Sequence, residues 1–275
     1  MPPVRVPHGG RRQPTLTALL FLKLALVPFA VWLASLAARR WGHAVSGYLG
    51  GFPMIGGPIT LYLALDHGPE FAARSALVTM AAVAGQAAHM LAFSVTGRAV
   101  GAIAGLFAGW AAFAAVSAGV GVLPLTPVWA LAIAASGLVA MARFLPHPKS
   151  ATTLPAIPPA ELWLRLAAAL GLACAILFGA SALGPTLSGI LLSMPITGSI
   201  MPPFTLAHYG PDALARLQRG FITGLTGFIA FFFTVSLAVI PLGTVAAFSL
   251  ATAAAVTAVA IFSSARRWKT RSARG

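Results

Sequence analysis

One segment of this chain occurs twice, and the repetition limits the folds that the chain can adopt. Residues 46–74 align without a gap with residues 188–216 at a constant offset of 142, and nine of the 29 aligned positions are identical. Each copy is an apolar stretch broken by proline and glycine, followed by a Gly-Pro-acid corner. Internal repetition indicates two related structural units. In a membrane protein, apolar segments interrupted at corresponding positions point to a binding site between the two halves.

The composition places the chain in a lipid bilayer. Hydrophobic residues make up 59% of it and charged residues 8%, whereas a soluble domain carries about 25% charged residues. The net charge of +14 does not indicate a nucleic-acid partner, because Lys and Arg lie almost wholly between the apolar runs. Basic residues in such places act as topology signals and as contacts for anionic lipids. The single cysteine, Cys174, excludes an internal disulfide.

Nine apolar runs are long enough to cross a bilayer core of about 30 Å as helices. The first is interpreted as a span rather than a cleaved signal, because its length of about 22 residues exceeds the roughly 7–15 of a signal sequence. Continuous apolar runs, without the alternation of a barrel strand, predict an all-α integral membrane fold. The predicted spans are 15–38, 43–67, 70–95, 99–121, 126–145, 160–182, 185–209, 212–237 and 242–263.

The offset pairs the first four spans with the last four and leaves the fifth without a partner. Five crossings separate the starts of the two repeats, and an odd number turns the second repeat over, so we expect two inverted four-helix repeats joined by a connector helix. The predicted parts are a basic tail (1–14), repeat A (15–122), the connector helix (126–145), a Pro-rich loop (146–159), repeat B (160–263) and a basic cytoplasmic tail (264–275).

Positive charge predicts the orientation. With the N-terminus outside, thirteen Lys and Arg residues lie on the cytoplasmic side and four outside, which favours a cytoplasmic C-terminus. The basic N-terminal tail argues the other way, and re-entrant segments at 43–67 and 185–209 would change the count of crossings. The side of the N-terminus and the nature of these two segments therefore stay open.

The second and seventh spans are each broken near the middle. Proline in a helix interior costs about 3 kcal/mol and glycine about 1 kcal/mol more than alanine. The freed backbone groups need protein, water or a ligand as partners, and half-helix N-termini attract anions. Two breaks at equivalent places fit two interpretations equally well: simple helix kinks, or a site that binds a solute. The predicted substrate-binding residues are Pro53, Gly56, Gly57, Pro58, Pro195, Thr197, Gly198 and Ser199.

The Gly-Pro-acid corners have a structural explanation. Glycine suits the end of one helix, proline the first turn of the next, and an acid there complements the helix dipole. The alternative is a pair of ion-pair gates, one on each side of the membrane, with histidines that titrate near neutral pH. The gating or proton-handling candidates are Asp66, His67, Glu70, Arg74, His89, His208, Asp212 and Arg216.

Gln86 and His89 form a polar pair inside the third span. They lie three residues apart and so share a helix face. The repeat places Phe228 and Phe231 at the equivalent positions. The pair therefore belongs to one half only. Polar groups at this depth serve either a helix-to-helix hydrogen bond or a transport pathway.

The sequence gives no indication of an enzyme, a cofactor or a metal site. It has no phosphate-binding loop and no zinc motif. The only matched acids, Glu70 and Asp212, would lie on opposite membrane faces in inverted repeats, so they cannot form a shared aspartyl-protease site.

Short motifs in both halves carry a likeness to a known group of proteins. These motifs are Phe52-Pro53, Gly57-Pro58, Phe71-Ala72-Ala73-Arg74 and Leu217-Gln218-Arg219-Gly220. On them, the chain resembles uncharacterised bacterial polytopic inner-membrane proteins that have two related Pro/Gly-broken halves. The resemblance covers both repeats and excludes the termini. It implies a multi-pass protein of the bacterial inner (plasma) membrane, but the group has no assigned activity and implies no substrate.

The sequence therefore predicts a small secondary transporter or exporter of a polar or anionic small molecule, working by alternating access. The alternatives are a non-transporting accessory subunit or lipid-handling protein and, less favoured, an intramembrane enzyme. The expected partners are a bilayer with anionic lipids and an unidentified solute, and a homo-oligomer is compatible with the sequence.

Overall fold

The structure is a computed structural model of the chain. It describes residues 39–149 and 184–272, together with residues 25, 28–29, 31–37, 160, 162–168 and 170–171. Within these residues every regular element is a helix, so the all-α prediction is confirmed for the described part of the chain. Most of the first predicted span (15–38) and of the sixth (160–182) lies outside the described residues, as do the basic tail 1–14 and most of the Pro-rich loop.

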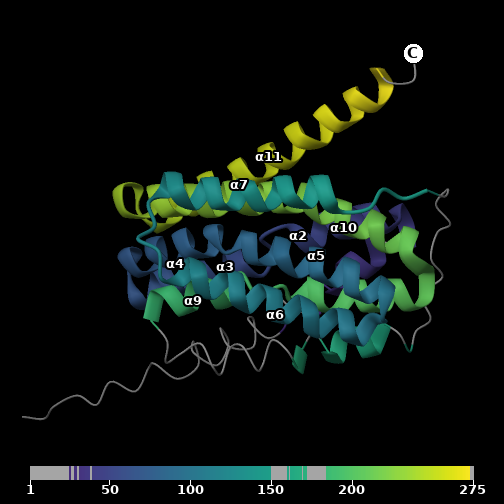
Figure 1. The fold of residues 1–275 in the computed structure, drawn as a ribbon. Helices are drawn as coiled ribbons and strands as arrows, with labels where there is room; N and C mark the ends of the chain where they lie inside the picture. Colours follow the sequence, from purple (N-terminus) through teal and green to yellow (C-terminus); the bar gives the residue numbers. More distant parts are fainter. Residues whose placement is uncertain are drawn as a thin grey trace, which may run out of the picture.

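The labels of the described helices are those of Figure 1. They are α2 (His43–Gly51), α3 (Gly56–His67), α4 (Pro69–Ala81), α5 (Val83–Ala99), α6 (Ala102–Gly121), α7 (Pro127–Phe144), α9 (Gly184–Leu192), α10 (Ile196–Leu242) and α11 (Thr244–Ser272).

The described helices contain six segments that are long and apolar enough to cross a membrane. They are His43–His67, Pro69–Ala99, Ala102–Gly121, Pro127–Phe144, Gly184–Leu242 and Thr244–Ala265. The Gly184–Leu242 segment has 59 residues, about 90 Å of helix or three bilayer cores. It is not one rod, because Gly210 interrupts it with a φ of 76°. The length and composition of these segments are those of a membrane protein with several spans. The count of nine spans stays a prediction.

The helix boundaries of the two copies recur at the offset found in the sequence. Gly68 and Gly210 both have positive φ, 91° and 76°, and each precedes a proline that starts or restarts a helix. Gly101 and Gly243 are also equivalent at the offset of 142, and both have positive φ, 129° and 75°. Glycine adopts this backbone without steric cost, and proline suits a first helical turn. The local chemistry of Gly and Pro therefore sets the same boundaries twice.

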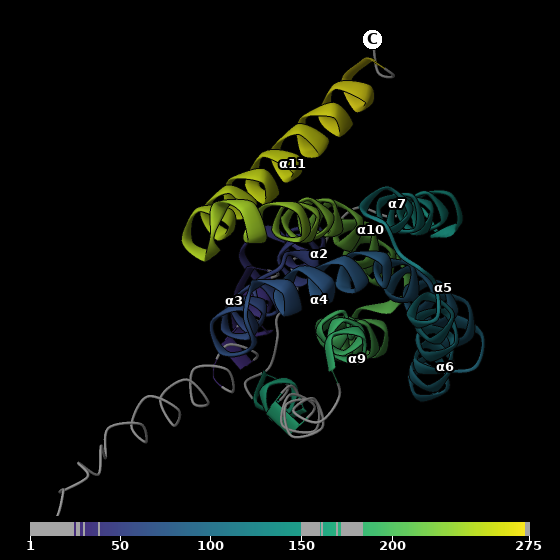
Figure 2. The ribbon, with the colours of Figure 1, turned by 90° about the vertical axis from the view of Figure 1, so that its left-hand side faces the viewer.

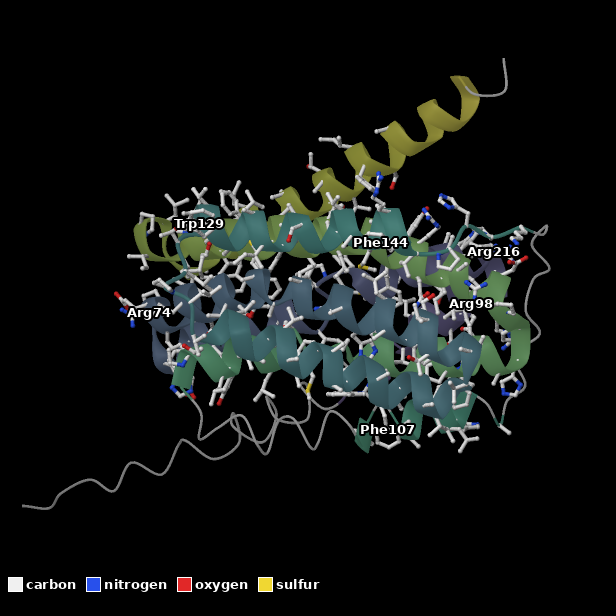
Figure 3. The ribbon with its side chains drawn as sticks, in the orientation of Figure 1. Arg74, Arg98, Phe107, Trp129, Phe144 and Arg216 are labelled. Atoms are coloured by element: carbon white, nitrogen blue, oxygen red, sulfur yellow. The ribbon has the colours of Figure 1, made fainter. Side chains whose placement is uncertain are left out.

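The helices pack side by side with α4, α5 and α10 at the centre. Figure 1 shows most of them lying along one common direction, and Figure 2 views the bundle along that direction. In the most apolar 18-residue stretch of Pro69–Ala99, 72% of the residues are buried within the protein, against 22% in the corresponding stretches of Pro127–Phe144 and Thr244–Ala265. The outer helices α7 and α11 therefore present apolar faces outward, as Trp129 and Phe144 do in Figure 3. Such faces suit a lipid environment.

Candidate functional site

The candidate site lies where two helices are interrupted by short non-helical segments. The first break separates α2 from α3 at residues 52–55, where Phe52 has a φ of −79° and a ψ of 151°. The second separates α9 from α10 at residues 193–195, where Pro195 has a φ of −78° and a ψ of 64°. Both breaks fall where the sequence places Pro53 and Pro195, because neither residue can donate a helical hydrogen bond.

The two breaks meet in the structure. The Thr197 hydroxyl, in the first turn of α10, donates a 2.8 Å hydrogen bond to the Gly50 carbonyl at the end of α2. A Cβ at Gly56 would lie 3.7 Å from the Leu192 carbonyl oxygen at the end of α9. Each broken helix therefore contacts the interruption of the other.

A proline beyond the second break frees a carbonyl that a histidine then satisfies. Pro202 lies four residues after Gly198 and has no N–H, so the Gly198 carbonyl lacks its helical donor. His89, from the centre of α5, supplies one instead, because its Nε2 lies 3.2 Å from the Gly198 oxygen. A carbonyl can only accept, which places the ring proton on Nε2. The bond ties α5 to the interrupted part of α10.

The imidazole of His89 is completely buried between three helices. Its Nδ1 faces the backbone of α6, where a Cβ at Gly109 would lie 2.8 Å from it. The Trp110 ring stands nearly perpendicular to the imidazole, at a centroid distance of 6.2 Å. Gly109 therefore makes the room that the imidazole occupies. Gln86, one turn earlier, is also buried.

Phenylalanine rings fill the space beside the first break. A Cβ at Gly56 would lie 3.0 Å from Phe232, and one at Gly57 would lie 3.2 Å from Phe231. Pro58 lies on the exposed side of α3. Of the eight predicted substrate-binding residues, seven are buried and Pro58 is the exception. The structure thus places the glycines at the junction with aromatic rings packed against them.

Most of the hydroxyls near the breaks bond to their own helix. Thr60 donates to the Gly56 carbonyl at 2.7 Å, and Ser199 donates to the Pro195 carbonyl at 2.7 Å. Such bonds are the ordinary state of a hydroxyl inside a helix. Thr197 differs, because its hydroxyl crosses to the other break.

The equivalent helices of the two copies make equivalent contacts. The small face of α2 at Gly47 contacts the Leu217 carbonyl of α10. The matching face of α9 at Gly189 contacts the Ser75 carbonyl of α4, where a Cβ would come to 2.6 Å. The offset of 142 relates Gly47 to Gly189 and Ser75 to Leu217. Each copy therefore packs its first short helix against the post-corner helix of the other.

The two corners lie away from the breaks. At the first, His67 Nε2 lies 3.4 Å from an oxygen of Asp66, and the two side chains are 46% and 44% exposed. The second holds an aromatic group in which the Tyr209 ring lies 5.2 Å from that of His43 and 6.2 Å from that of His208.

Figure 3 shows Arg74, from the first corner, and Arg216, from the second, at opposite ends of the bundle. Glu70, like Asp66 and His67, is exposed, whereas Asp212 and Arg216 are partly buried. The structure therefore separates the corner candidates into two groups and leaves His89 with the breaks.

The structure shows two polar side chains that hold helices together and that the sequence analysis did not predict. The Gln218 amide nitrogen donates to the Met90 carbonyl at 2.9 Å, and Gln218 is fully buried. Arg219 donates to the Pro146 carbonyl at 2.9 Å and to the Leu145 carbonyl at 2.6 Å, at the end of α7. The available signal was a Gln-Arg pair at the start of the apolar run that follows the second corner, because a polar group beside such a run requires a partner.

Among the described residues, no cluster of His, Cys, Asp and Glu could hold a metal ion. Comparison with protein-family models finds no match, and comparisons with curated proteins and with solved structures find none either. The class that the fold and the site define is an α-helical membrane protein with two broken helices in contact.

Proposed function

We propose that the protein is a small secondary transporter of a polar or anionic small molecule, with its solute site at the junction of the two helix breaks. The observation that carries the proposal is the hydrogen bond from Thr197 to the Gly50 carbonyl, which joins the two interruptions. Interrupted helices are tolerated at membrane depth where their backbone groups meet protein or line a cavity. Broken helices that meet near the middle of the bilayer are a common basis for transporter sites.

The direction of the helix ends supports a polar or anionic solute. The first turn of α3 begins at Gly56 and the first turn of α10 begins at Ile196, both at the junction. A helix N-terminus carries about half a positive charge and unpaired N–H groups. Two such ends, with the Thr197 hydroxyl between the breaks, favour an anionic group over a cation.

The packing register supports an inverted relation of the repeats. In the α2 contact with α10, Gly47 opposes Gly220 and Gly51 opposes Gly224, so the two helices run in the same direction. The offset equates this part of α10 with α4, which returns from the corner at Gly68 against the direction of α2 and α3. The post-corner helices of the two copies therefore run in opposite directions. The opposite positions of Arg74 and Arg216 in Figure 3 agree with this.

Alternating access then needs the aromatic packing at the junction to open and close. Phe231 and Phe232 of α10 fill the space beside Gly57 and Gly56 of α3, which makes this an occluded arrangement. Separation of α3 from α10 would admit the solute. We assign the gates to the corners, with Asp66, His67, Glu70 and Arg74 at one end and His208, Asp212 and Arg216 at the other.

The end of the bundle with Arg98 and Arg216 is assigned to the cytoplasm of a bacterial inner membrane, because positive charge collects on the cytoplasmic side. Arg266, Arg267, Lys269 and Arg271 lie in the last turns of α11, and we assign the C-terminus to the same side.

Thiol labelling tests the inverted arrangement. Asp66 and His208 are equivalent in the repeat and both are exposed. In a Cys174→Ser background, Asp66→Cys and His208→Cys should react with a membrane-impermeant maleimide from opposite sides of right-side-out vesicles. Labelling of both from the same side would contradict inverted repeats.

Solute flux tests the site. The purified protein in liposomes is offered a mixture of organic acids, amino acids and sugar phosphates, and the vesicle contents are measured by mass spectrometry. Thr197→Val removes the bridging hydroxyl and should reduce uptake of the transported solute at least about tenfold, the effect of one lost hydrogen bond of about 1.4 kcal/mol. The matched control is Thr234→Val, whose hydroxyl bonds only to its own helix at the Ala230 carbonyl. No uptake of any solute by the wild-type protein, or equal uptake by both variants, would reject the proposal.

A further inference from the structure

A groove runs between α5 and the end of α7, away from the helix breaks. Its volume is about 700 Å³. The apolar walls come from the last turns of α5 and from the segment where α7 ends, and Arg98 is the one charged residue that lines it. Besides Arg98, the lining residues are Leu91, Ala92, Ser94, Val95 and Ala99 of α5 with Phe144 and Pro146, and Ser94 is the one uncharged polar residue among them.

Firm packing on both sides defines the groove. Nearer the middle of the bundle α5 and α7 are in close contact, because a Cβ at Gly137 would lie 2.9 Å from Ala84 Cα. At the other end, Arg219 holds the Leu145 and Pro146 carbonyls with bonds of 2.6 and 2.9 Å. The α7 wall therefore ends at a fixed place while α5 continues to Ala99.

The groove opens outward on the apolar surface of the bundle. Val95 and Phe144 are 72% and 71% exposed. From Leu91 to Arg98 is seven residues, or about 10 Å of helix. This is the depth between the headgroups and the upper part of the acyl chains, if Arg98 lies at the interface. Figure 3 shows Arg98 near one end of the bundle, which agrees with that position.

The charge around the groove has one sign. Residues 71–160 contain Arg74, Arg98, Arg143 and Lys149 and no Asp or Glu. Three of these four cations, all but Arg74, lie in or near the segments that form the groove. Among the described residues Arg98 forms no ion pair or hydrogen bond, and it is exposed. Basic pockets between membrane helices on the cytoplasmic side bind anionic lipid headgroups.

We propose that this groove is a binding site for an anionic glycerophospholipid of the leaflet on the Arg98 side. The Arg98 guanidinium binds the phosphate through charge-assisted hydrogen bonds, and an acyl chain lies along the apolar walls. A soluble anion gains no binding energy from the apolar walls, and a zwitterionic lipid gains less electrostatic attraction than an anionic one, because the charges around the groove are all positive. The site is separate from the proposed solute junction and does not depend on it.

Native mass spectrometry of the purified full-length chain tests the proposal. The protein in detergent is titrated with phosphatidylglycerol and, separately, with phosphatidylcholine of the same acyl chains. We expect one phosphatidylglycerol molecule to be retained at least about tenfold more tightly than phosphatidylcholine. Arg98→Gln should weaken retention about tenfold or more, as loss of a charge-assisted hydrogen bond does. Ala99→Trp, at an exposed position in the wall, should weaken it by filling the groove.

Two controls make the result specific. Arg74→Gln removes an exposed arginine at the other end of the same span and should leave retention unchanged. Arg98→Lys keeps the charge without the planar fork and should retain part of the affinity. Equal retention by Arg98→Gln and the wild-type protein, or equal retention of the two lipids, would overturn the proposal. Displacement of the lipid by an equal concentration of soluble glycerol phosphate would also overturn it, because the site would then bind the free anion.

Discussion

Alanine at Gly47 tests the contact that joins the two halves. Every one of the three atoms nearest to a Cβ at Gly47 belongs to the α10 backbone: the Leu217 oxygen, the Phe221 nitrogen at 2.9 Å and Gly220 Cα at 3.0 Å. No side chain can rotate away, so α10 itself must move. Overpacking of this kind costs about 1–3 kcal/mol. Because Gly47 faces backbone only, we expect the upper half of that range.

The matched control is Gly119→Ala in α6, because a Cβ there meets nothing within 4 Å. Both substitutions gain about the same helix propensity, up to about 1 kcal/mol, so that term cancels in the comparison. The free energy of unfolding, measured by circular dichroism in mixed detergent–SDS micelles, should be about 2–3 kcal/mol lower for Gly47→Ala than for Gly119→Ala.

The second copy provides an independent check. Gly189 has the Ser75 oxygen and the Val78 Cβ as its nearest neighbours, at 2.6 and 2.7 Å. Gly189→Ala should therefore also lower the free energy of unfolding relative to Gly119→Ala. If Gly47→Ala and Gly189→Ala were both within about 0.5 kcal/mol of Gly119→Ala, the reciprocal packing of the two copies would be wrong.

Substitutions at three further positions test particular residues of the site and the fold, each by the free energy of unfolding in the same micelles. His89→Phe introduces the residue that the other repeat has at the equivalent position, and it should lower the free energy of unfolding by about 1–3 kcal/mol because the Gly198 carbonyl loses its donor. His89→Gln keeps a donor and should lower it by less. Equal losses of stability in the two variants would contradict the hydrogen bond. Gly210→Ala should cost about 1–3 kcal/mol, because the φ of 76° and ψ of −176° at this residue lie in a region that almost only glycine adopts. A Cβ there meets nothing within 4 Å, so the cost is backbone strain alone, and an unchanged stability would count against the corner. Arg219→Gln should cost about 1–3 kcal/mol by leaving the carbonyls at the end of α7 without donors, and proteolysis after residue 145 should increase; unaltered cleavage would argue against this anchor.

The parts of the fold that follow from local chemistry could be predicted from the sequence. Pro53 and Pro195 lack an N–H, so helix breaks at both were expected and are present. Gly68 and Gly210 stand before prolines, and both adopt the positive φ of a helix end. A residue that restricts its own backbone acts the same way in any tertiary setting, which is why these boundaries were readable.

The partners of the freed groups could not be predicted, because they depend on which helix faces which. Proline inside a helix leaves a carbonyl without a donor, but the sequence did not identify His89 as the donor to the carbonyl that Pro202 frees. It likewise did not distinguish Thr197, which bridges the breaks, from Ser199, which bonds to its own helix. The Gly47/Gly51 and Gly220/Gly224 pairs have the small-xxx-small spacing of a close helix contact. This contact could therefore have been predicted from the sequence.

The two halves share a backbone plan but are held together by different chemistry. Glycines at 47, 51, 220 and 224 bring α2 and α10 into backbone contact. At the equivalent contact, Gly189 of α9 also lies against the Ser75 backbone of α4, and Ser75 and Thr79 add hydrogen bonds to the Pro185 and Gly189 carbonyls of α9, at 3.2 and 3.0 Å. Contacts between glycine faces are lost steeply with separation, so both contacts depend on close approach of the two backbones. The α4–α9 contact has hydroxyl hydrogen bonds in addition, because its second helix contributes Ser75 and Thr79 where α10 has Leu217 and Phe221.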